Sequence, residues 1–338
     1  MTILNIMLGK KRGGLEQAAL DYAQALDIAG IACLTVTSAD AWLVPQLTAA
    51  HVAHESLVCH GNWDILAVRR LRTIAERTKA TAIICHGNRA ISIALKALKG
   101  RIPVIAVAHN YSTRRFARAD ACFAITPHLQ EYLASTGCKN IFIMPNMARL
   151  SDALPRGPFR TPPIIGSMGR FVAKKGFKSY IEALSVLRSR GVTFRALLGG
   201  EGKESAQLME LIARYQLEDI VTYTGWVQNK STFFAAIDIF VLPSLEEAFG
   251  IVLIEAMSHG IPVVSADAHG PSQIIHEGVD GLLVARNDPE AMADAIESLL
   301  ANPARAAKLG EEGAKLVADE YTMEAMARRL KTTLAAFT

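Results

Sequence analysis

The feature that most constrains the fold is a regular alternation of short apolar runs with longer amphipathic stretches. Apolar runs rich in Val, Ile and Ala are typical of parallel strands that helices cover on both faces. In the first half we expect strands at Thr2–Leu8, Ala32–Thr37, Ala82–Cys85, Val104–Ala108, Ala121–Ile125 and Ile141–Met144. The expected helices are Leu15–Ala29, Asp64–Thr78, Arg89–Lys99 and Pro127–Thr136. This pattern predicts a doubly wound α/β domain.

The alternation stops at residues 151–163, SDALPRGPFRTPP, and then begins again. Proline at this density fits neither a helix nor a central strand, so this segment is the expected linker. Expected strands beyond it are Ile164–Met168, Arg195–Leu198, Val221–Thr224, Ile239–Leu242, Pro262–Ser265 and Gly281–Val284. Expected helices are Phe177–Arg190, Glu204–Tyr215, Lys230–Ala236, Ile251–Ser258, Pro289–Leu300, Ala304–Ala318 and Met323–Ala336. A chain of 338 residues therefore divides into domains at 1–150 and 164–320, with a C-terminal helix in 321–338.

Composition narrows the class of protein. With 51% hydrophobic and 20% charged residues, the chain has an ordinary globular composition. No apolar run reaches the roughly 18 residues of a membrane-spanning helix. The apolar start, Met1 to Leu8, precedes its basic residues, so we expect a first strand and not an export signal. Five cysteines without a C-x-x-C pair favour a cytoplasmic location over a disulfide framework or a structural zinc site.

Charge is distributed unevenly between the two halves. Residues 1–150 contain 17 Lys and Arg against 9 Asp and Glu, whereas residues 151–338 contain 19 against 23. Nine of the cations in the first half lie in three clusters, at Lys10-Lys11-Arg12, Arg69-Arg70-Arg72 and Arg114-Arg115-Arg118. Such an excess favours an anionic partner, either a membrane surface or a phosphorylated glycan, or else reflects solvated helix faces. Few aromatic residues lie among the clusters, which argues against single-stranded nucleic acid.

The segment PSLEEAFGIVLIEAM, residues 243–257, contains the strongest functional signal. It follows an expected strand and leads into an apolar helix, with Gly250 at the corner. Free N–H groups at the start of a helix suit a phosphate. Glu255 lies within the apolar helix, where hydroxyls of a ligand would satisfy its carboxylate. On these grounds alone, a capped helix with one surface glutamate remains open.

The E-x7-E spacing from Glu247 to Glu255 resembles the signature of family 4 glycosyltransferases with the GT-B fold. Several other segments match the pattern of that family in the same order. They are Gly166–Phe171 and Lys174–Phe177 (together similar to G-R-x-x-x-x-K-G), Gly199–Gly202, Gly225–Val227, Gly260–Val264 and Gly278–Val284. The resemblance covers almost all of the second half and is looser in the first.

The resemblance implies two Rossmann-like domains facing across a cleft, with the last helix crossing back to the first domain. It implies transfer of a sugar, with retention of configuration, from a nucleotide diphosphate sugar to a hydroxyl of a glycan or glycolipid. We expect UDP-sugars over GDP-sugars as donors and a pathway of cell-envelope polysaccharide or lipopolysaccharide-core synthesis. We expect no cofactor and, since no D-x-D triplet is present, no metal. Family members that extend lipid-linked glycans dock a basic first domain on membranes, so a peripheral position at the inner membrane face is expected.

The resemblance also implies roles for individual residues in the second half. Glu255 would hold the ribose hydroxyls, and Glu247 would hold hydroxyls of the donor sugar. Arg170 and Lys175 would stabilise the negative charge that develops on the departing diphosphate. The remaining expected donor contacts are the backbone at Gly250 and Ile251, together with Phe249, Val227 and Gly200.

In the first half, Gly13-Gly14 follows the first strand and matches a glycine loop of the family. The loop would face either the donor phosphates or the acceptor, or form only a turn. It is not G-x-G-x-x-G, so the dinucleotide fingerprint is absent. His109 ends a strand where similar enzymes place a residue near the donor sugar, although a packed histidine fits equally. His86 is a weaker acceptor-side candidate, and Asn146 is expected to serve local structure.

Two other functions remain open at this point. One is a sugar-nucleotide epimerase of the GT-B fold, and the other is a sugar-nucleotide-binding protein without catalysis.

Overall fold

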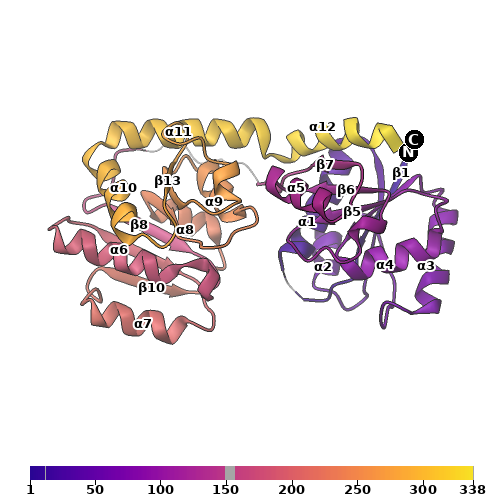
Figure 1. The fold of residues 1–338 in the computed structure, drawn as a ribbon, viewed down its shortest axis with the longest axis horizontal. Coiled ribbons are helices and arrows are strands. Elements are labelled where there is room, and N and C mark those ends of the chain that lie inside the picture. The colour runs from indigo at the N-terminus through magenta and orange to yellow at the C-terminus, as the bar shows by residue number, and fades with distance from the viewer. Residues whose placement is uncertain (12, 149–156, 338) are drawn as a thin grey trace. The chain divides into compact units, whose positions relative to one another are not determined.

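The computed structural model describes residues 1–11, 13–148 and 157–337. The chain forms two compact units (Figure 1). The first unit comprises Met1–Met147 together with the C-terminal segment from Met323, and the second comprises Ala148–Thr322. Positions 151–156 of the linker predicted at 151–163 lie outside the described residues.

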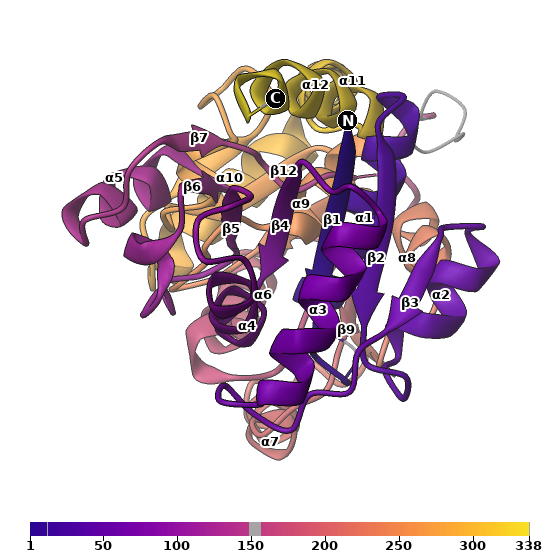
Figure 2. The ribbon, with the colours of Figure 1, turned by 90° about the vertical axis from the view of Figure 1, so that its right-hand side faces the viewer.

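The first unit contains a parallel sheet in the order β3-β2-β1-β4-β5-β6-β7, which Figure 2 shows strand by strand. Its strands are β1 (Thr2–Met7), β2 (Ala32–Thr37), β3 (His54–Ser56), β4 (Ala82–His86), β5 (Val104–Ala108), β6 (Ala121–Ala124) and β7 (Ile141–Ile143). Its helices are α1 (Gly14–Ile28), α2 (Leu43–Ala49), α3 (Ile65–Arg77), α4 (Asn88–Leu98), α5 (Pro127–Ser135) and α12 (Met323–Leu334). Short 3-10 turns, η1 (Phe116–Arg118) and η4 (Ala335–Phe337), complete it.

The second unit contains a parallel sheet in the order β10-β9-β8-β11-β12-β13. Its strands are β8 (Ile164–Met168), β9 (Arg195–Gly199), β10 (Val221–Gly225), β11 (Ile239–Leu242), β12 (Val263–Ala266) and β13 (Leu282–Val284). Its helices are α6 (Phe177–Ser189), α7 (Ser205–Arg214), α8 (Lys230–Ala236), α9 (Ile251–Ser258), α10 (Pro289–Ala301) and α11 (Pro303–Glu320). Two 3-10 turns, η2 (Ala173–Lys175) and η3 (Pro271–Gln273), lie in its loops.

The predicted doubly wound sheets are therefore confirmed, and every expected strand and helix is present with ends within two residues. The pattern missed α2 and β3. The three residues of β3 are polar and partly buried at the sheet edge, where alternation cannot be recognised. Helix α2 has seven residues and contains Pro45, which suits only a first helical turn.

Helix α12 is part of the hydrophobic core of the first unit. Its buried side chains Met326, Leu330 and Leu334 join the cluster that also contains Tyr22 and Leu26 of α1. A helix at the end of the sequence thus packs on the first helix, because its apolar positions recur on one face. None of the described helices combines the length and the apolar composition needed to cross a membrane.

Strand order defines one switch point in each sheet, where successive connections leave in opposite directions. It lies between β1 and β4 in the first unit and between β8 and β11 in the second. In open parallel sheets the carboxyl ends of the strands at a switch point form the usual ligand site. Most of the functional candidates follow these four strands.

Candidate functional site

In the second unit, the loops after β8, β9 and β11 are joined by backbone hydrogen bonds. The N–H of Phe171 donates to the carbonyl of Glu201 at 2.9 Å. The carbonyl of Lys174 accepts from the N–H groups of Leu245 and Glu246, at 2.9 and 3.0 Å. These bonds hold the segments that carry Arg170, Lys175 and Glu247 as one surface, so the loops that the sequence analysis singled out are brought together.

Two glycines make this close approach of loops possible. At Gly176, where φ is +64°, a Cβ would lie 2.0 Å from the carbonyl oxygen of Pro243. At Gly200, where φ is +142°, a Cβ would lie 1.9 Å from the carbonyl oxygen of Gly169. Both backbone conformations favour glycine, and neither site has room for a side chain. The predicted donor-site residue Gly200 thus has a structural reason to be glycine.

Lys175 and Glu247 form an ion pair with little exposure, 19% for the lysine side chain and 14% for the glutamate. The hydroxyl of Ser244 donates a further hydrogen bond to Glu247 Oε2 at 3.3 Å. The sequence analysis gave these two residues different ligand groups, diphosphate and sugar. The structure places them in contact, so a diphosphate at Lys175 would compete with Glu247 and release its carboxylate.

Arg170 follows β8 and its side chain is exposed. Within the described ranges, its guanidinium has no hydrogen-bond or ion-pair partner. An exposed cation loses conformational entropy when it binds an anion, but it breaks no existing contact. Arg170 is therefore available to a ligand, whereas Lys175 is already engaged.

Helix α9 begins at Ile251, with Gly250 as its N-cap at a φ of +103°. No side chain of the described residues caps this end, so the first N–H groups are available to an anion. The preceding residue, Phe249, is buried, and its ring lies 5.8 Å from that of Tyr321. Any donor contact of Phe249 would therefore involve its backbone. Val227, half-buried after β10, lies against Gly199.

Glu255 is satisfied within the protein. The ammonium of Lys230, the first residue of α8, donates to both carboxylate oxygens at 2.6 and 2.8 Å. Sequence reasoning missed Lys230 and assigned these oxygens to ligand hydroxyls. A signal was available, because a cation at the start of a helix is disfavoured by the helix dipole unless it has a partner elsewhere.

In the first unit, Asn5 of β1, His86 at the end of β4 and His109 just after β5 form a largely buried series of hydrogen bonds. His86 Nε2 lies 2.8 Å from Asn5 Oδ1, and His86 Nδ1 lies 3.0 Å from His109 Nε2. The Asn5 amide donates to the carbonyl of Ala19 at 2.7 Å, which leaves its oxygen facing His86. The Asn146 side chain raises the pKa of His109, against the larger effect of burial. Sequence reasoning missed Asn5, although an asparagine inside an apolar strand was a signal.

The donor-to-acceptor direction of these hydrogen bonds determines which ring nitrogens of His86 and His109 carry protons. Because Asn5 Oδ1 only accepts, His86 Nε2 donates to it. Burial lowers the pKa of His86, and its ring is therefore neutral with a bare Nδ1. That atom accepts from His109 Nε2–H. Burial also lowers the pKa of His109 to about 4, so both rings are neutral at pH 7.

These two histidines should make the fold acid-sensitive below pH 6.5. Their pKa values are lower in the folded chain than the ordinary 6.5, so the unfolded chain binds more protons in this range. Stability is then complete above about pH 6.5 and falls as the pH drops towards 4, by up to about 1.4 kcal/mol per pH unit for each histidine. In melting curves across this range, His109→Gln should show a shallower decline than wild type. His60→Gln, at an exposed position, is the control, and equal slopes in all three proteins would contradict the assignment.

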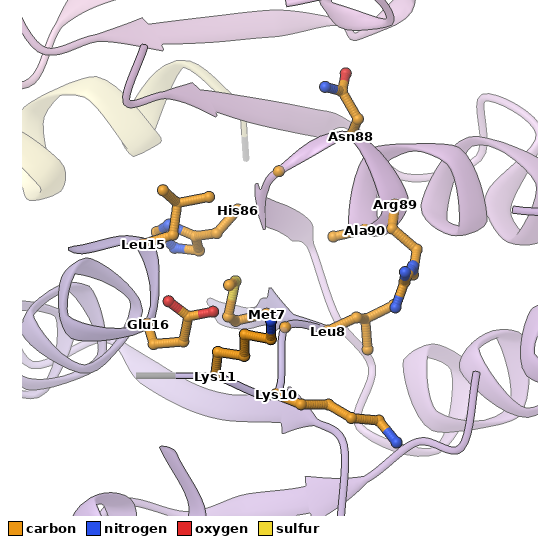
Figure 3. A pocket seen from close by; sticks show the side chains of 12 residues that line it. Met7, Leu8, Lys10, Lys11, Leu15, Glu16, His86, Asn88, Arg89 and Ala90 are labelled. Atoms are coloured by element: carbon orange, nitrogen blue, oxygen red, sulfur yellow. The ribbon is translucent and has the colours of Figure 1, made fainter. Parts of the chain in front are cut away.

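Gly13 and Gly14 lie at the start of α1. Gly13 is its N-cap in an extended conformation, and a Cβ there would lie 2.8 Å from Glu16 Oε2. A pocket of about 460 Å³ opens beside this loop, between the ends of β1 and β4 (Figure 3). Within the described ranges, no group of three or more His, Cys, Asp or Glu side chains is arranged to hold a metal ion.

Comparison with known families decides the class of protein. Residues 155–316 match the model described as glycosyl transferases group 1, and residues 12–151 match the model of glycosyltransferase family 4. The chain is a GT-B glycosyltransferase. The enzyme is 29% identical over 335 residues to the lipopolysaccharide core biosynthesis glycosyltransferase LpsE of Rhizobium meliloti, covering 96% of each chain. It is 33% identical over 205 residues to the alpha-D-kanosaminyltransferase of Streptomyces kanamyceticus, covering 60% of this enzyme and 52% of that protein.

Solved structures share the fold of this glycosyltransferase. Anabaena HepE in complex with UDP superposes with a TM-score of 0.84 at 20% identity, covering 99% of this chain and 100% of HepE. The lipopolysaccharide outer core galactosyltransferase WaaB in its apo form gives 0.78 at 18% identity, with full coverage of both chains. The predicted GT-B fold is thus confirmed.

Proposed function

We propose that the enzyme is a retaining, metal-independent hexosyltransferase of envelope polysaccharide or lipopolysaccharide synthesis. Its donor would be a nucleotide diphosphate sugar, with UDP as the expected nucleotide, and its acceptor a hydroxyl of a glycan or glycolipid. The observation that carries the proposal is the Lys175–Glu247 pair on the surface that also presents Arg170 and the uncapped start of α9. The names of LpsE and WaaB support the pathway, and the HepE complex with UDP supports the donor.

In this proposal the diphosphate draws Lys175 away from Glu247. Arg170, Lys175 and the N–H groups at the start of α9 stabilise charge on the leaving diphosphate as its bond to the anomeric carbon breaks. The released Glu247 accepts hydrogen bonds from hydroxyls of the donor sugar. The acceptor oxygen attacks from the face that the leaving group vacates, and its proton passes to a phosphate oxygen of the nucleoside diphosphate.

Two further residues act on the donor in this proposal. Glu255 exchanges Lys230 for the ribose hydroxyls, which is inexpensive because Lys230 is half-exposed. A neutral His109 orients a hydroxyl of the donor sugar. Because it bears no charge at pH 7, it contributes no ion pair to the diphosphate.

A melting-temperature panel of nucleotide sugars tests the donor site. One UDP-sugar should stabilise the protein, by about 2.7 kcal/mol at a concentration 100 times its Kd. Glu255→Gln should weaken that shift. Glu246→Gln, an exposed neighbour in the same motif, should leave it unchanged. If no nucleotide sugar raises the melting temperature, the proposed donor site is wrong.

Product analysis with the same donor separates the three functions. Nucleoside diphosphate release that depends on an acceptor hydroxyl supports transfer. Release of nucleoside diphosphate together with an altered free sugar, in the absence of an acceptor, would identify an epimerase. Binding without turnover in the presence of envelope glycan acceptors would identify a non-catalytic binding protein.

We also propose that α3 contacts an anionic membrane surface. Trp63, Ile65 and Leu66 are 80%, 67% and 75% exposed at its start, and Arg69 and Arg70 follow as exposed cations. Apolar side chains beside cations suit the boundary between headgroups and acyl chains. The double variant Trp63→Ser/Leu66→Ser should bind vesicles of phosphatidylglycerol roughly tenfold more weakly in sedimentation assays. Val279→Ser, exposed in the second unit, is the control, and equal binding of all three proteins would refute the contact.

A further inference from the structure

The pocket at the switch point of the first unit has no role in the donor chemistry proposed above. It has a volume of about 460 Å³ and lies where β1 and β4 end and α1 and α4 begin. His86 forms part of its lining (Figure 3). This volume is within the range of small-molecule sites, which is roughly 300–1,000 Å³.

Glu16 is a mostly buried acidic side chain in the lining of this pocket. It is only 8% exposed, and Figure 3 shows its carboxylate directed into the pocket. Among the described residues, none donates a hydrogen bond to it or forms an ion pair with it. Its oxygens occupy the space of absent side chains, since a Cβ at Gly9 or Gly13 would lie 2.3 or 2.8 Å from them. The carboxylate oxygens therefore face the open pocket, where hydroxyls of a bound sugar can donate to them.

The rest of the pocket favours an anion. Lys11 and Arg89 line it, and neither has a hydrogen-bond or ion-pair partner within the described ranges. Lys10 differs, because it pairs with Asp40 at 2.7 Å and extends away from the pocket in Figure 3. Helix α4 begins here after Gly87; no side chain in the described part of the chain caps it, and its first turn has no acidic residue. Its free N–H groups and dipole therefore add positive potential on that side.

We propose that this pocket binds the terminal sugar of the acceptor, and that this sugar is acidic, bearing a carboxylate or a phosphate. Hydroxyls of the sugar donate to Glu16, and its anionic group contacts Lys11, Arg89 and the start of α4. A neutral sugar would leave the cations unused, and a bare diphosphate would be repelled by Glu16. The inference rests on the proposed glycosyltransferase function and specifies its acceptor.

Ligand-observed NMR titration of the full chain tests the pocket with glucose, glucuronic acid, glucose 6-phosphate and inorganic phosphate, and with the galactose and mannose counterparts. At least one acidic sugar should bind tenfold or more tightly than its neutral parent and than inorganic phosphate. The carboxylate and phosphate arms then distinguish the two anionic groups. Equal affinity for acidic and neutral sugars, or no binding by any sugar at 20 mM or so, would overturn the proposal.

Variants assign the two halves of the pocket. Glu16→Gln should weaken the binding of neutral and acidic sugars alike by roughly tenfold. The double variant Lys11→Ala/Arg89→Ala should lower the affinity for acidic sugars to that of their neutral parents. Glu131→Gln, an exposed carboxylate on α5, should change nothing. If Glu16→Gln lowers only the melting temperature, Glu16 merely stabilises the start of α1 and the assignment is wrong.

The melting-temperature shift with the UDP-sugar distinguishes failure of the acceptor-pocket proposal from failure of the proposed function. The melting-temperature shift with the UDP-sugar should be the same in Glu16→Gln as in wild type, because Glu16 is given no contact with the donor. Loss of that shift would show that the pocket holds the donor and would overturn this inference. If the wild-type protein itself binds no nucleotide sugar, the proposed function is overturned instead.

Discussion

Replacing Arg170 or Lys175 by alanine is expected to lower kcat by about 10²–10³, because each would remove a cation that stabilises the leaving diphosphate. The effect should appear in kcat more than in the donor Kd, since the charge to be stabilised develops as the bond breaks. Turnover is measured by acceptor-dependent release of nucleoside diphosphate. Lys174→Ala removes an exposed cation from the same loop and is the matched control.

The two variants should differ in stability, which provides a second readout. Arg170 has no side-chain partner within the described ranges, so its removal should leave the melting temperature unchanged. Removal of Lys175 leaves Glu247 poorly exposed without its cation, and the melting temperature should fall. Near-wild-type turnover in either variant would refute the role assigned to that residue.

Gly176→Ala is expected to destabilise the second unit by about 2–4 kcal/mol. The new Cβ would lie 2.0 Å from the backbone oxygen of Pro243, and the positive φ adds strain. The loop after β8 must then separate from the loop after β11, which breaks the hydrogen bonds at the carbonyl of Lys174. Activity should fall as well, because Lys175 and Glu247 lie on the two loops.

Gly191→Ala distinguishes the cost of a positive φ from the cost of a steric clash between loops. Gly191 has a φ of +77°, close to that of Gly176, but no atom lies within 4 Å of its added Cβ. Its substitution should therefore cost only about 1 kcal/mol and leave turnover unchanged. Unfolding by guanidinium measures both effects. If the two variants are equally stable, the close approach of the loops does not explain why residue 176 is glycine.

The secondary structure followed from local pattern wherever elements were long and buried. Strands such as Val104–Ala108 are apolar throughout because helices cover both faces of the sheet. The short polar strand His54–Ser56 was missed, because its position depends on pairing with β2. No local signal in three polar residues predicts such pairing.

The candidate site was likewise predicted where it depends on local motifs and missed where it depends on tertiary contacts. Motif spacing placed Arg170, Lys175 and Glu247 in loops that follow strands, and Glu255 in the helix beyond Gly250. Fold topology explains why those loops lie at one edge of the sheet. The spacing did not predict that Lys175 pairs with Glu247, or that Lys230 pairs with Glu255. The partners are 72 and 25 residues apart in the sequence, so only packing brings them into contact.

His109 and Glu16 show what only the tertiary structure decided. Taken by itself, the sequence determined two doubly wound domains, because periodicity is a local property, and its resemblance to a family motif predicted a donor site. It left His109 open between a packed histidine and a ligand contact. Asn5, His86 and His109 lie in or just after three adjacent strands, and their hydrogen bonds decide which nitrogens of the two histidine rings carry protons. Glu16 lies beside a conspicuous glycine pair, but its position in the pocket, with no donor among the described residues, depends on how β1, α1 and α4 meet. Ring protonation and desolvation are properties of the three-dimensional surroundings, which no stretch of sequence contains.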